Sequence, residues 1–120
     1  MCIRDRAYRA LQAALPALLE NGDAVQRGDA LLARAQALCT LAAAPGQRAA
    51  ALLAAADAAA AAVDALATAG QLQLLAEACY LHARVLHCVP GCTRERNAAA
   101  RRFLKARQRY CAGALSLIHI

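Results

Sequence analysis

The chain has 120 residues, of which 61% are hydrophobic, but only 3% are aromatic and none is tryptophan. This length allows one small domain or a piece of a larger one, and the scarcity of aromatic side chains excludes a large core built on aromatic packing. The formal net charge is +6, but most of the excess lies between Arg94 and Arg109. The charge therefore does not indicate a general nucleic-acid or membrane-binding surface.

The two ends of the chain differ in composition from the rest. All isoleucines (Ile3, Ile118 and Ile120) and the single serine (Ser116) lie in the terminal hexapeptides MCIRDR and LSLIHI. MCIRD and the start of the next codon can be back-translated into one particular DNA string. The opposite strand of that DNA encodes LSLIHI. That string is similar to the transposon end used in sequencing adapters. We therefore interpret residues 1–6 and 115–120 as adapter-derived, and we expect residues 7–114 to be a helical-repeat fragment.

Apolar residues recur at helical spacing through five segments. The first predicted helix covers residues 7–20, and we expect Pro16 to kink it or to loosen one turn. In the NGD segment that follows, we expect Gly22 to be a left-handed C-terminal cap and Asp23 to be an N-cap. The second predicted helix covers residues 24–43 and ends at APGQ, because the residue before a proline leaves helical geometry. Its inward-facing residues are expected to be Leu31, Leu32, Ala35, Leu38 and Cys39.

The third predicted helix covers residues 48–68 and ends at Gly70, and the fourth covers residues 71–88 and ends at PGCT. The apolar face of the fourth helix is expected to contain Leu75, Ala78, Cys79, Ala83 and Leu86. We expect Thr93 to cap the fifth helix, residues 94–111, although Arg96 stands where a capping box has Glu or Gln. Gly113 is expected to end this helix.

Helices of this length joined by short turns pack as antiparallel neighbours, either in a compact bundle or in part of an α-solenoid. Ala99, Phe103 and Ala106 favour the solenoid, because they have the Ala-x3-Phe-x2-Ala spacing of the second helix of a tetratricopeptide repeat. Ala99 would let two helices approach closely, and Phe103 would fill the groove between them. The sequence therefore predicts an all-α fold of antiparallel helical hairpins, a tetratricopeptide-like α-solenoid fragment of about five helices.

One segment carries a more specific pattern, EACYLHARVLHCVPGCTRERNAAARRF over residues 77–103. A helix end of the form A-R-x-x-H is followed by a glycine turn and by T-x-E-R-N-x-x-A-x-x-F. The positions concerned are Ala83, Arg84, His87, Gly91, Thr93, Glu95, Arg96, Asn97, Ala100 and Phe103. This order resembles the C-terminal tetratricopeptide-like region of the anaphase-promoting complex subunit 5 family, with one extra residue here at Val89–Pro90. The upstream segment ALPALLENGDAVQRGDALLARAQAL is similar to the preceding hairpin of that family.

The resemblance implies a non-catalytic scaffold in the platform of a ubiquitin ligase of the cell cycle, present in the nucleus and cytoplasm. It implies other protein subunits as partners, and no cofactor, no small-molecule substrate and no membrane. An extended solenoid surface suits this role. Two alternatives stay open: an unrelated bacterial helical-repeat binding module, natural for an alanine-rich chain from a GC-rich genome, and a basic nucleic-acid-binding helical domain, which is the least favoured.

Five cysteines remain outside the terminal hexapeptides: Cys39, Cys79, Cys88, Cys92 and Cys111. In a helical chain such cysteines are more often small buried apolar residues than disulfides. The spacing of Cys88 and Cys92 lies in the range for zinc, but a structural zinc site needs four convergent ligands. His82 and His87 are five residues apart and do not share a helix face well, so we expect no metal site.

A row of basic residues follows helical spacing on the last predicted helix: Arg94, Arg101, Lys105 and Arg109, with Arg102 beside them. This row is a possible surface for an acidic partner or for nucleic acid, although charge runs are more often only solvated faces. No aromatic residues interleave with it for base stacking, and weak salt-dependent DNA binding is a general property of such a row.

Catalytic groups have little support in the sequence. Residues 7–114 contain no serine, which excludes a Ser-His-Asp triad. Cys79 and His82 lie three positions apart on a predicted helix but have no evident third group to orient them. No glycine-rich phosphate loop is present, and we expect the protein not to be an enzyme.

Overall fold

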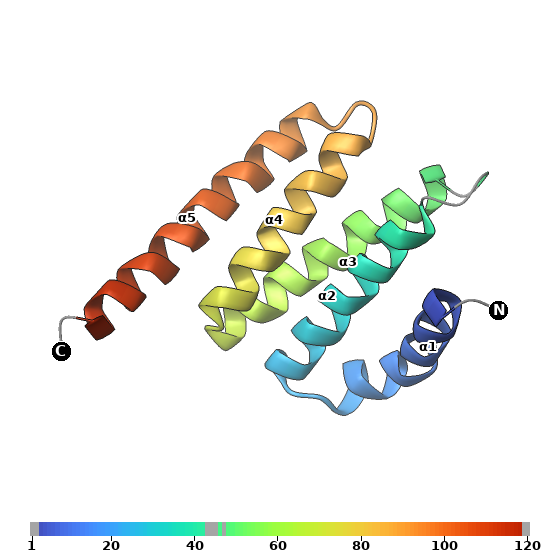
Figure 1. The fold of residues 1–120 in the computed structure, drawn as a ribbon, viewed down its shortest axis with the longest axis horizontal. Coiled ribbons are helices and arrows are strands. Elements are labelled where there is room, and N and C mark those ends of the chain that lie inside the picture. The colour runs from blue at the N-terminus through green and yellow to red at the C-terminus, as the bar shows by residue number, and fades with distance from the viewer. Residues whose placement is uncertain (1–2, 43–45, 47, 119–120) are drawn as a thin grey trace.

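The computed structural model describes residues 3–42, 46 and 48–118, with side chains for residues 6, 9–42, 46 and 48–112. This part of the chain is all-helical and contains five helices and no strand: α1 (Ile3–Asn21), α2 (Ala24–Leu41), α3 (Arg48–Ala69), α4 (Leu72–Cys88) and α5 (Thr93–Ile118). Figure 1 shows that consecutive helices run in opposite directions. The all-α prediction is confirmed, and each predicted helical segment corresponds to one helix. Cys2 and His119 lie outside the described residues.

The junction between α1 and α2 contains one correct and one wrong prediction. Asp23 is the N-cap of α2: its Oδ1 accepts from the Gln26 N–H at 2.8 Å, and the Asp23 N–H donates to Gln26 Oε1 at 3.1 Å. This reciprocal capping box satisfies two backbone donors that the helix leaves unpaired. Gly22, however, is not left-handed, because the described glycines with positive φ are Gly46, Gly70 and Gly91; its N–H donates to the Leu18 carbonyl at 2.8 Å. Glycine is needed here for space, since a Cβ would collide with that carbonyl oxygen.

Removing the cap of α2 is expected to destabilise the fold. Asp23→Ala should lower the free energy of unfolding by about 1 kcal/mol, because the Gln26 N–H would lose its acceptor. Urea denaturation followed by circular dichroism measures this change. Asp29→Ala is the matched control, because Asp29 is exposed on the same helix beyond its first turn. Equal losses in the two variants would contradict the capping role.

Glycines with positive φ lie in the turns that follow α3 and α4. Gly70 (φ +71°) ends α3 as predicted, and Gly91 (φ +80°) forms the turn between α4 and α5. Thr93 is not the N-cap of α5 but its first helical residue, because the Cys92 carbonyl accepts the first helical bond, from the Arg96 N–H at 2.8 Å. Gly113 does not end α5, which continues to Ile118. A glycine costs a helix interior only about 1 kcal/mol and ends it only where the backbone turns left-handed.

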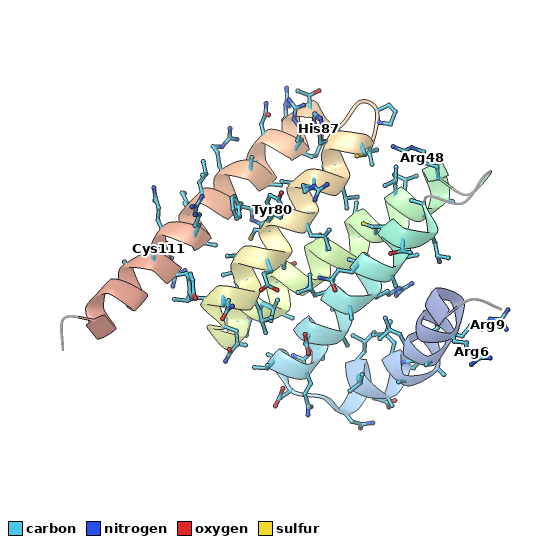
Figure 2. The ribbon with its side chains drawn as sticks, in the orientation of Figure 1. Arg6, Arg9, Arg48, Tyr80, His87 and Cys111 are labelled. Atoms are coloured by element: carbon cyan, nitrogen blue, oxygen red, sulfur yellow. The ribbon has the colours of Figure 1, made fainter. Side chains whose placement is uncertain are left out.

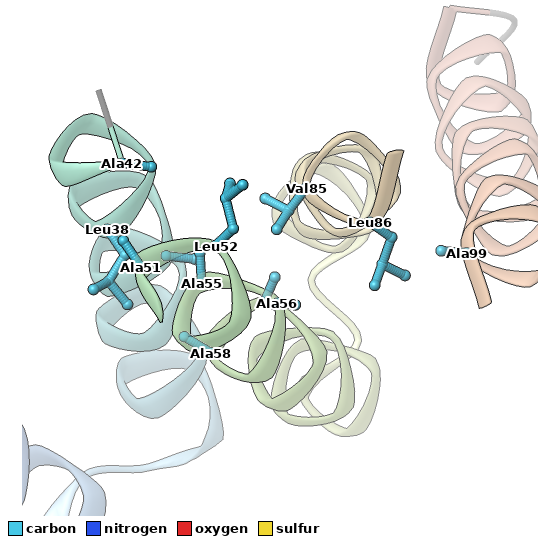
Figure 3. Close-up of a cluster of buried hydrophobic side chains, with 12 residues drawn as sticks. Leu38, Ala42, Ala51, Leu52, Ala55, Ala56, Ala58, Val85, Leu86 and Ala99 are labelled. Atoms are coloured by element: carbon cyan, nitrogen blue, oxygen red, sulfur yellow. The ribbon is translucent and has the colours of Figure 1, made fainter. Parts of the chain in front are cut away.

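Helix α3 lies between α2 and α4 and is buried on more than one side. Its buried residues are Ala51, Leu52, Ala55, Ala56, Ala58, Ala59, Ala62, Val63 and Leu66. Figure 3 shows Leu52 of α3 and Val85 of α4 pointing toward each other above this alanine surface. Because most of these side chains end at Cβ, the neighbouring helices approach α3 closely, and alanine also favours the helical state.

Helix α3 is also, within the described ranges, the one helix long and apolar enough to cross a membrane. That test considers only length and composition, and the core helix of a soluble protein passes it as well. Here α2 and α4 both pack against α3, and Asp57 and Asp64 are exposed on it.

The helices pack in chain order. Each of α2·α3, α3·α4, α4·α5 and α1·α2 forms an interface, and α2·α4 is the only other pair of described helices whose Cα atoms come within 8 Å of each other. The backbone of α1 therefore packs on α2 alone, with Leu15 buried, and that of α5 packs on α4 alone, although the Arg102 side chain of α5 also reaches Asp64 of α3. The molecule measures 50 × 35 × 23 Å, so it is about two helix diameters thick.

Candidate functional site

The predicted repeat positions lie at the contact between α4 and α5. Ala99 and Ala106 are buried there, whereas Ala100 and Phe103 are half-buried. The Phe103 ring lies 5.3 Å from the ring of Tyr80 on α4, at an interplanar angle of 50°. Gly91 lies in the turn between the two helices, and Ala99 and Ala106 belong to the two buried clusters that α4 also lines.

An aromatic groove lies on one side of this pair of helices. It is lined by Gln73, Ala76, Glu77, Tyr80, Phe103, Arg107, Tyr110 and Cys111. Figure 2 labels Tyr80 on α4 and Cys111 on α5. The Arg84 guanidinium lies 5.6 Å from the centre of the Tyr80 ring, within range of a cation–π interaction. This groove was not predicted, although Phe103 and Tyr110 are seven residues apart and therefore share a helix face.

The five basic residues of the predicted row on α5 are all exposed, but the structure separates them into two groups. Arg102, Lys105 and Arg109 line a second groove of about 210 Å³, hereafter the basic groove, whereas Arg94 and Arg101 lie outside it. The remaining residues of the basic groove are Val63 and Ala67 of α3, Leu75 and Cys79 of α4, and Ala106 of α5. The basic groove thus has an apolar floor, formed by these residues, and a rim of the three cationic side chains.

One carboxylate lies at this rim. Asp64 Oδ1 is 3.6 Å from Arg102 Nη2, and the side chains are 79% and 52% exposed. An exposed pair of this kind contributes at most about 1 kcal/mol. Lys105 and Arg109 have no acidic partner within the described part of the chain.

The cysteines and histidines do not converge. Among the described residues, no three His, Cys, Asp or Glu side chains are placed to hold a metal ion. His87 is engaged elsewhere, because its Nδ1 lies 3.2 Å from Nη1 of Arg96; arginine can only donate, so this nitrogen accepts.

The two most buried cysteines have raised pKa values. Burial raises the pKa of the Cys79 thiol, against a smaller opposing effect of Arg102. Burial also raises the pKa of Cys39, with a further contribution from Cys88 and an opposing one from Arg84. A thiol that resists ionisation is a poor nucleophile, so the environment of Cys79 does not favour a Cys79–His82 catalytic pair.

We expect His82 to make the stability of the fold sensitive to acid. Burial, and then the charge of Arg102, lower the pKa of His82 below its ordinary value of 6.5, against an opposing effect of Asp64. The unfolded chain therefore binds more protons at this histidine than the folded chain, and stability is lost as the pH falls through 6.5. His82→Gln should reduce the difference in unfolding free energy between pH 7.5 and pH 5.5, measured in urea. An unchanged difference would contradict the assignment to His82.

Comparison with known proteins yields no relative from which a function could be transferred: no family model, no curated protein and no solved structure matches the chain.

Proposed function

We propose that the chain is a non-catalytic protein–protein scaffold, a stretch of tetratricopeptide-like α-solenoid. Specifically, we propose that it belongs to the platform subunit 5 of the anaphase-promoting complex, whose C-terminal region it resembles in sequence. Its partners are then other protein subunits of that ubiquitin ligase.

The order of helix packing carries the solenoid proposal. In a closed bundle the first and last helices pack against several others, whereas here the backbone of α1 approaches only α2 and the backbone of α5 approaches only α4. The single contact outside chain order, α2·α4, joins the first helices of two successive pairs, α2–α3 and α4–α5. Nearest-neighbour packing of helix pairs is the arrangement of a solenoid.

The residues of the subunit 5 pattern also have structural roles that fit the proposal. His87 and Arg96, which the pattern places on opposite sides of the glycine turn, contact each other at 3.2 Å. Gly91 takes the left-handed conformation that few other residues adopt. Phe103 packs on Tyr80. These contacts thus connect residues of the pattern on both sides of the turn between α4 and α5.

Recovery of the complete gene tests this proposal. We expect the sequence around residues 7–114 to encode further helix pairs, and the tagged full-length product to co-purify with the other platform subunits of the ligase. A short bacterial reading frame, or a full-length product that leaves those subunits behind, would overturn the subunit 5 assignment and favour the unrelated bacterial binding module.

A further inference from the structure

We propose that the basic groove is the docking site for an acidic amphipathic helix of a protein partner, one that inserts an aliphatic side chain between the rim cations. This inference rests on the proposed scaffold function and specifies the chemistry of one partner. The site is formed by side chains of three helices, α3, α4 and α5.

The packing of the helices leaves room for this partner. Helices α3 and α5 both pack against α4, but among the described residues no Cα atom of α3 lies within 8 Å of a Cα atom of α5. The two helices meet at the rim, where the exposed Arg102 side chain reaches Asp64. The apolar residues that line the groove are Val63, Ala67, Leu75, Cys79 and Ala106. The volume of about 210 Å³ is enough for one large apolar side chain, since an apolar cavity of about 150 Å³ holds a benzene molecule.

The charge at the rim specifies an acidic partner. Arg102, Lys105 and Arg109 recur at i, i+3 and i+7 on α5, so their backbone positions span about 10.5 Å along the helix axis. Carboxylates at the same spacing on a second helix would stand opposite them. Lys105 and Arg109 have no acidic partner in the described part of the chain, and the exposed Asp64–Arg102 pair is weak enough to be exchanged for one with the partner.

The floor favours a protein over a nucleic acid. Both are attracted by positive charge, but binding of single-stranded nucleic acid also depends on aromatic residues on which bases stack. The residues that line the basic groove include no aromatic side chain. An aliphatic side chain from a protein would bury this apolar surface, which a phosphate backbone cannot do.

The test uses the full 120-residue chain and a fluorescent helical peptide with glutamates at i, i+3 and i+7 beside one leucine. Fluorescence anisotropy should detect binding to the unmodified chain, and Lys105→Glu/Arg109→Glu should weaken it about tenfold. Arg94→Glu/Arg101→Glu is the matched control, because it makes the same change in net charge on the same helix but outside the basic groove. The control should retain most of the affinity. Circular dichroism establishes that each variant is folded.

A second pair of variants tests the floor without changing charge. Ala67→Leu should fill the basic groove and weaken peptide binding, whereas Ala50→Leu, at an exposed position of α3 outside it, should not. Replacing the peptide leucine by alanine should also weaken binding.

Three outcomes would overturn the docking proposal: no binding to the unmodified chain, equal losses in the two charge-reversal variants, or a preference for single-stranded DNA over the peptide. None of these bears on co-purification of the full-length product with the platform subunits. A failure of the groove proposal is therefore distinguishable from a failure of the proposed function.

Discussion

Leu66→Ala is expected to lower the free energy of unfolding by about 2–5 kcal/mol. Leu66 is the largest fully buried side chain of the described residues, with 0% exposure. It belongs to the cluster of Leu31, Leu32, Val63 and Leu75, which joins α2, α3 and α4. Truncation removes its apolar contacts and leaves a cavity. The surrounding helices relax only partly into such a cavity, so the cavity adds to the cost of the lost contacts.

Leu53→Ala is the control for this loss, because Leu53 lies on the same helix but is 55% exposed. Urea denaturation of both variants gives the comparison, and Leu53→Ala should change the free energy of unfolding by well under half as much. Domains of this kind are stable by only about 5–15 kcal/mol, so Leu66→Ala should move the transition clearly. Equal effects of the two substitutions would show that this core cluster does not stabilise the fold.

Gly28→Ala is expected to destabilise the chain by about 1–2 kcal/mol, although alanine is the better helix former. Gly28 is buried on α2, and a Cβ there would lie 2.5 Å from Cγ and 2.6 Å from Cδ2 of Leu66. These distances are far below normal van der Waals contact, and Leu66 has no solvent-exposed side to move toward. The overpacking cost therefore exceeds the gain in helix propensity, which is about 1 kcal/mol.

A double-mutant cycle tests the contact itself. In a Leu66→Ala background the methyl group that Gly28→Ala introduces has free space. Gly28→Ala should therefore be neutral or stabilising in that background. The interaction energy between the two positions should fall in the range of about 0.5–3 kcal/mol found for contacting residues. If the changes in unfolding free energy caused by Gly28→Ala and Leu66→Ala simply add, the result would contradict the close approach of α2 to α3 at this point.

Helical periodicity was enough to predict most of the buried faces of α2 and α4. Leu31, Leu32, Ala35 and Leu38 of α2 are buried as expected, whereas Cys39 is only half-buried; residues at i, i+3, i+4 and i+7 lie on one face of a helix. The same argument placed Leu75, Ala78, Cys79 and Leu86 on the buried face of α4, but it missed Val85 and included Ala83, which is only half-buried.

The same argument does not apply to α3, because apolar residues surround this helix. Sequence periodicity could not select which of its alanines face α2 and which face α4. It also could not show that Leu66 lies opposite Gly28, since that contact joins residues 38 positions apart in sequence.

The sequence also predicts only part of the candidate site, and the helix packing decides the rest. The helical spacing of Arg94, Arg101, Lys105 and Arg109 is a property of the sequence, as is the position of Arg102 beside them. The positions of α3 and α4 decide which of these residues border an apolar groove, and only Arg102, Lys105 and Arg109 do so.

The sequence by itself determined the all-α class, the five helices, the glycine turns at Gly70 and Gly91 and the cap at Asp23, because these depend on local backbone preferences and short-range hydrogen bonds. Only the tertiary structure decided the space-limited glycine at Gly28, the half-buried environment of His82 and the basic groove. Each of these depends on distances between side chains far apart in sequence, and such distances are fixed by helix packing.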